Sequence, residues 1–128
     1  MKQQELFAQM DRLGVHTQEA IDRFMGNEAL FLSFVCKLPE KLDFTRIQSG
    51  LEEEDEDAFY LHVHSLKGMA GNLGLVPIYD CAQAILVEFR TSKFKNKKKL
   101  AALLQEAETE SQTLSALIRQ YLAEERDV

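Results

Sequence analysis

Four residues in one short segment have types and spacing that suit group-transfer chemistry: His64, Lys67, Gly68 and Gly71. In a helix, residues three, four and seven positions apart share a face, so the lysine and both glycines lie beside the histidine. An exposed imidazole presents a nucleophilic ring nitrogen near neutral pH. A lysine one turn away can neutralise an anionic group that is transferred onto that ring. Together these residues favour phosphoryl transfer.

Two glycines inside one helix need an explanation, because each costs roughly 0.5–1 kcal/mol relative to alanine. One explanation is close packing of another helix, and the other is that a large partner must approach His64. At about 100° per residue, Gly68 and Gly71 lie on the face turned away from the apolar stripe, which favours the approach of a partner. The core-facing stripe of this helix consists of Phe59, Val63, Leu66, Ala70 and Leu73.

The other histidines and the cysteines are predicted to be structural. His62 falls on the flank of the apolar stripe, so we expect a half-buried side chain rather than a second acceptor. His16 lies in a predicted surface turn. Cys36 and Cys81 fall on apolar stripes, where cysteine packs as a small hydrophobe. These residues lack the short paired spacings of a zinc site, so no metal site is predicted.

The elements that must position His64 are helices, because apolar residues recur throughout at spacings of three and four, with no sustained alternation. Asn27 is a predicted helix cap, and Pro39 closes one helix or begins the next. The sequence therefore predicts an all-α bundle of long antiparallel helices. The predicted helices cover residues 5–13, 17–25, 28–38, 42–51, 59–73, 77–89 and 97–124.

Two charged segments interrupt this pattern. Residues 52–57 are all acidic, and we expect a solvated loop at the positive N-terminal end of the next helix. The alternative is a metal site, but the run lacks the spacing and the turn glycine of a calcium loop. Residues 93–99 contain five lysines. We interpret them as a solvated connector; the alternatives are a nucleic-acid patch and long-range attraction of an acidic partner.

The composition sets the remaining limits. The chain has 128 residues and a net charge of −6, which suits one domain over residues 1–128 and argues against nucleic-acid binding. No segment resembles a signal peptide or a membrane span, and two cysteines fit a reducing compartment. No nucleotide-binding glycine loop is present, so no kinase activity of its own is expected. We expect a cytoplasmic monomer with no membrane partner.

The motif residues resemble a known signature. The segment from His64 to Gly74 is similar to H-x-L-K-G-x-x-x-x-[L/I]-G of histidine-containing phosphotransfer (HPt) domains. The stretch from Ile21 to Leu30 is also similar to the first bundle helix of that family, with its Gly-Asp/Asn break. The resemblance covers about residues 15–122, which we take as the bundle core.

This resemblance implies an up-down antiparallel four-helix bundle with one or two additional N-terminal helices. His64 would accept a phosphoryl group from the aspartate of a response-regulator receiver domain and pass it to a second receiver; a hybrid histidine kinase is a further candidate partner. Lys67 would contact the phosphoryl oxygens, and Leu61, Gly68 and Gly71 would form the docking surface. No cofactor is implied, and Mg²⁺ is expected only in the partner receiver.

One position departs from the family pattern. Many relatives carry a Gln or Glu on the following helix that hydrogen-bonds the histidine ring, and this position is Leu86 here. Gln83, one turn earlier, either takes over the orientation of the ring or is a surface residue. Two other functions remain open: a non-catalytic docking module with a relic histidine, and the phosphoacceptor domain of a chemotaxis-type histidine kinase.

Overall fold

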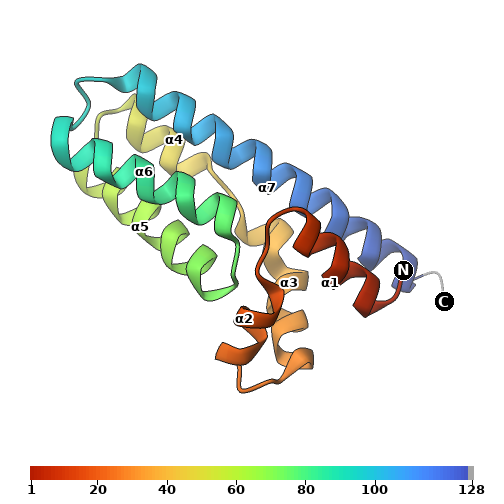
Figure 1. The fold of residues 1–128 in the computed structure, drawn as a ribbon. Coiled ribbons are helices and arrows are strands. Elements are labelled where there is room, and N and C mark those ends of the chain that lie inside the picture. The colour runs from red at the N-terminus through yellow and green to blue at the C-terminus, as the bar shows by residue number, and fades with distance from the viewer. Residues whose placement is uncertain (127–128) are drawn as a thin grey trace.

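The computed structural model describes residues 1–126, and its regular elements there are all α-helices (Figure 1). The all-α prediction is confirmed. None of the helices in this part of the chain is both long and apolar enough to cross a membrane. The seven helices are α1 (Gln3–Arg12), α2 (Thr17–Arg23), α3 (Glu28–Lys41), α4 (Thr45–Glu52), α5 (Glu56–Asn72), α6 (Val76–Ser92) and α7 (Lys97–Arg126).

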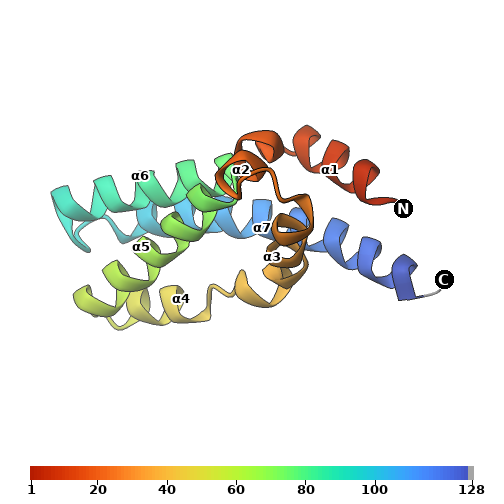
Figure 2. The same cartoon turned by 90° about the horizontal axis from the view of Figure 1, so that it is seen from below.

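The helices α4 to α7 form an up-down bundle, as Figures 1 and 2 show from two directions. Each helix packs on the next one in the chain, α4 on α5, α5 on α6 and α6 on α7. Burial of apolar side chains between these layers stabilises the arrangement. Fully buried side chains from α5, α6 and α7 include Phe59, Val63, Ile85, Leu86, Leu100 and Ile118.

Residues 42–44 are not helical and separate α3 from α4, so three helices, α1 to α3, precede α4. α1 and α3 both pack against α7. Pro39 lies inside α3, near its end, and neither closes nor begins a helix. The predicted cap of α3 is confirmed, because the Asn27 side chain accepts a hydrogen bond from the backbone N–H of Leu30 at 3.0 Å.

Backbone hydrogen bonding joins the turn after α5 to the turn before α2. The backbone N–H of His16 donates to the carbonyl oxygen of Gly74 at 2.8 Å, and Val15 and Leu75 form an isolated bridge. Gly74 has a φ of +71°, and a Cβ there would lie 2.6 Å from the His16 oxygen. Only glycine satisfies both conditions without strain. This contact places α2 beside the C-terminal end of α5.

The two charged segments meet at the opposite end of the bundle. Lys93 Nζ lies 3.6 Å from a carboxylate oxygen of Glu56, and Lys97 Nζ lies 3.6 Å from one of Glu54. The side chain of Asp55 accepts a hydrogen bond from the backbone N–H of Ala58 at 3.1 Å and thereby caps α5. The acidic run therefore lies at the N-terminal end of the next helix, as predicted, although Glu56 and Asp57 belong to α5 itself, and the run also binds the lysine connector.

Candidate functional site

His64 lies on the solvent face of α5, at the position that its helical angle predicts. Its side chain is exposed, whereas the neighbouring Val63 and Leu66 are buried in the core. His62 is half-buried, also as predicted. Leu61 is 57% exposed. The backbone of α5 thus presents one histidine ring, and not the other, to an approaching molecule.

The His64 ring is stacked on a tyrosine of the preceding turn. The ring centroids of Tyr60 and His64 are 5.7 Å apart, and the ring planes differ by 8°. Within residues 1–126, no hydrogen bond or ion pair restrains the imidazole. Tyr60 was not among the residues predicted from the sequence, although its position four residues before His64 on the same helix indicates a contact between the two rings.

Lys67 is held against an aromatic ring of the next helix. Its side chain is half-buried, and Nζ lies 5.7 Å from the ring centroid of Tyr79 on α6, within the range of a cation–π contact. Within the described residues, Lys67 forms no ion pair with a carboxylate. The ammonium group is therefore free to interact with an incoming anion one turn from His64.

The two glycines of the motif differ in their surroundings. A Cβ at Gly68 would meet nothing within 4 Å, as expected if a partner must approach there. A Cβ at Gly71 would lie 3.3 Å from Cδ2 and Cε2 of Tyr79. Tyr79 of α6 therefore packs beside Gly71, whereas Gly68 has open space, and the docking role of Gly71 stays a prediction. Helical angles identify a face of a helix but not the neighbour that packs at its edge.

Gln83, which the sequence offers either as the residue that orients the His64 ring or as a surface residue, is half-buried on α6. Its side-chain oxygen is buried and has no hydrogen-bond partner. Leu86, one turn after Gln83, is fully buried in the core. No hydrogen bond joins either α6 residue to His64 within the part of the chain that the structure describes. A register based on spacing alone could not show which way these side chains turn.

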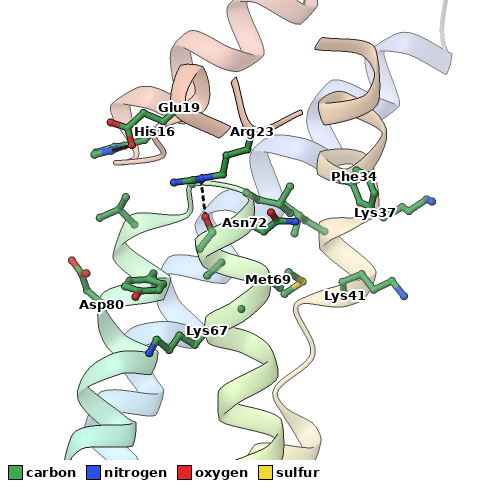
Figure 3. A pocket seen from close by; sticks show the side chains of 18 of the residues that line it. His16, Glu19, Arg23, Phe34, Lys37, Lys41, Lys67, Met69, Asn72 and Asp80 are labelled. Carbon is green, nitrogen blue, oxygen red and sulfur yellow. Dashed lines mark hydrogen bonds and ion pairs between the residues drawn. The ribbon is translucent and has the colours of Figure 1, made fainter. Parts of the chain in front are cut away.

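A groove of about 1160 Å³ begins beside His64 and runs between the α2–α3 region and the adjoining ends of α5 and α6 (Figure 3). Its lining includes apolar and aromatic side chains such as Phe34, Met69 and Tyr79. Arg23 Nη1 donates a hydrogen bond to the carbonyl oxygen of Gly71 at 2.8 Å, which ties α2 to the end of α5. We call this site the basic groove.

The basic groove is rich in cations, although the chain has a net charge of −6. Glu19 and Asp80 are the acidic residues of its lining, and Glu19 Oε2 lies 3.4 Å from Nδ1 of His16. Within residues 1–126, none of the lysines or arginines of the groove forms an ion pair. The groove therefore has more cations than carboxylates in its lining, and none of these cations is paired with a carboxylate within the described residues. Its cations are Arg23, Lys37, Lys41 and Lys67.

The two cysteines are placed as the sequence predicts. Cys36 and Cys81 are free and half-buried. Burial raises the pKa of the Cys36 thiol, and burial followed by the nearby Glu106 raises that of Cys81. A raised pKa keeps a thiol protonated and unreactive, so neither cysteine is poised for redox or nucleophilic chemistry.

Comparison with known families decides the class. A family model described as "Hpt domain" matches residues 34–127, which include most of α3 and all of α4 to α7. The chain belongs to the Hpt domain family. This Hpt domain is accordingly a histidine phosphotransfer module of two-component signalling. Comparison with curated proteins and with solved structures gives no match.

Family membership gives the Hpt domain a general role and a class of partners. Members are phosphocarriers rather than kinases, and they interact with receiver domains and histidine kinases. The family match begins at Phe34, so the stretch from Ile21 to Leu30 lies outside it. The similarity of that stretch to the first bundle helix of the family stays a prediction.

Proposed function

We propose that this Hpt domain is a phosphorelay intermediate in which His64 accepts a phosphoryl group from one receiver domain and passes it to another. The observation that carries the proposal is the exposed imidazole beside Gly68, where a side chain would meet nothing within 4 Å. Lys67 lies one turn away and has no internal carboxylate partner in the described residues.

In the accepting step, the lone pair of an unprotonated ring nitrogen of His64 attacks the phosphorus of the receiver's aspartyl phosphate. A nitrogen–phosphorus bond forms, the bond from phosphorus to the acyl oxygen breaks, and the carboxylate leaves with its electron pair. The ammonium group of Lys67 stabilises the negative charge on the phosphoryl oxygens. The second transfer reverses these steps with the carboxylate of another receiver.

The docked receiver would cover Leu61, His64 and Gly68 and extend over the basic groove. The phosphorylation site of a receiver is acidic, so the cations of the groove complement it and increase the rate of encounter. Mg²⁺ belongs to the receiver in this scheme, and the Hpt domain supplies no metal. The two free, half-buried cysteines suit a cytoplasmic protein, and the scheme needs only a monomer.

The test is incubation with a phosphorylated receiver domain, followed by measurement of acid-labile phosphate on the chain. The His64→Gln variant should lose acceptance and keep its fold, because an exposed side chain contributes little to the core. His62→Gln is the matched control on the same helix and should retain acceptance. Acceptance by His64→Gln, or its loss in a folded His62→Gln variant, would contradict the assignment.

A further inference from the structure

We propose that Tyr60 is a positioning residue for His64, a role that rests on the proposed function. Its ring holds the imidazole by stacking. The His64 side chain is exposed, and no hydrogen bond restrains its ring within residues 1–126. Such a ring would be free to change rotamer, whereas group transfer needs a fixed nitrogen.

The geometry of the pair supports this role. The two rings are nearly parallel, at 8°, and their centroids are 5.7 Å apart, within the range of attractive offset stacking. Tyr60 is 40% exposed, and His64 is also exposed, so the core does not impose this contact on either ring. Both residues lie on α5, four positions apart, which keeps the contact local to the helix.

The neighbouring side chains do not offer an alternative restraint. Leu86 is fully buried and has no polar side-chain atom. The buried oxygen of Gln83 forms no hydrogen bond, to His64 or to any other described group. Lys67 is directed to Tyr79, at 5.7 Å from the ring centroid. Stacking on Tyr60 is therefore the contact that can fix the orientation of the imidazole.

Orientation and docking affect different kinetic quantities. A receiver binds the whole face of α5, so loss of one ring contact changes the half-saturating receiver concentration little. The rate within the docked complex depends on how often the ring nitrogen points at the phosphorus. Loss of the stacked ring should therefore lower the saturating rate, whereas a tyrosine that served only docking would change the half-saturating concentration.

The kinetic test compares Tyr60→Phe, Tyr60→Leu and Gln83→Leu in single-turnover transfer from a phosphorylated receiver at increasing receiver excess. Tyr60→Leu should lower the saturating rate about two- to tenfold, the range that one aromatic pair accounts for. Tyr60→Phe keeps the stacked ring and should restore the wild-type rate. Gln83→Leu should transfer at the wild-type rate. A normal saturating rate in Tyr60→Leu, or a loss in Gln83→Leu instead, would overturn the role of Tyr60.

A second readout needs no receiver. In the NMR spectrum of the free protein, the Tyr60 ring current should shift the ring C–H signals of His64, and Tyr60→Leu should remove that shift while Tyr60→Phe keeps it. The signals of His16 and His62 serve as internal controls. Unchanged His64 signals in Tyr60→Leu would overturn the stacking. Absence of phosphate acceptance by the wild-type protein would instead overturn the proposed function and, with it, any role of Tyr60 in transfer.

Discussion

The cations at the two ends of the four-helix bundle have opposite electrostatic surroundings. At one end, which we call the connector end, residues 52–57 and 93–99 lie together. Lys93 and Lys97 pair with carboxylates of the acidic run, and Lys99 Nζ lies 3.0 Å from a carboxylate oxygen of Glu88. The densest run of lysines in the sequence is thus largely compensated by carboxylates of the same chain.

At the other end, the cations of the basic groove come from separate helices and have no ion-pair partner within residues 1–126. Arg23 lies on α2, Lys37 and Lys41 lie on α3, and Lys67 lies on α5, as Figure 3 shows. The number of lysines in a sequence segment therefore does not show where the protein attracts an acidic partner. This attraction arises where cations lack internal carboxylate partners, and here that place is beside His64.

The largest expected effect on the transfer rate is that of removing one lysine ammonium group at the groove end, compared with removing one at the connector end. Lys67→Ala should slow the saturating rate of transfer by about a hundredfold, because the charge on the phosphoryl oxygens loses its stabilising cation. The matched Lys97→Ala variant at the connector end should transfer normally. Single-turnover kinetics with a phosphorylated receiver measure both. Equal rates in the two variants would remove Lys67 from the mechanism.

Charge reversal tests the field of the groove rather than one contact. The double variant Lys37→Glu/Lys41→Glu should lower the association rate with a receiver about tenfold at low salt, and less at high salt. The double variant Lys95→Glu/Lys98→Glu changes the net charge equally at the connector end and should have a smaller effect. Stopped-flow association over a series of salt concentrations distinguishes them. A larger effect of the connector variant would show that the connector, and not the groove, steers the partner.

Alanine substitutions at two glycines test the difference in packing between the two ends. Gly68→Ala at the groove end adds a methyl group in open space and should raise the free energy of unfolding by about 0.5–1 kcal/mol. Gly50→Ala near the connector end should lower it, because a Cβ there would lie 3.1 Å from the backbone N and Cα of Phe59. Urea unfolding of both variants gives the sign. A destabilised Gly68→Ala variant would mean that this face of α5 is packed.

The smallest expected effect concerns acid stability at the connector end. The hydrogen bond from Lys99 lowers the pKa of the Glu88 carboxyl below its ordinary value. A carboxyl with a lowered folded-state pKa contributes stability that is complete above the ordinary glutamate pKa, about 4.3, and is lost as the pH falls through the lower folded value. Glu88→Gln should therefore lower Tm slightly at pH 7, and the difference from the wild type should be smaller at pH 3. A constant difference at both pH values would contradict this origin.

The local features of the site followed from the sequence. The angle of His64 on α5, the burial of Val63 and Leu66, and the cap at Asn27 depend on the chain within a few turns of each residue. The helical period is a property of the backbone itself, so apolar spacing indicates which side of a helix is buried. The resemblance to the family likewise depends on one short segment, from His64 to Gly74.

The tertiary structure decided what surrounds that face. The sequence could not show that Arg23 reaches the carbonyl of Gly71, 48 residues away, or that Tyr79 packs against the same glycine. It also could not show that the acidic run and the lysine run compensate each other across the bundle. A residue's angle is measured about its own helix axis and contains no information on the distance to another helix. The packing of α6 on α5, and the placement of α2 and α3 near the end of α5, therefore put the exposed histidine at the edge of a basic groove.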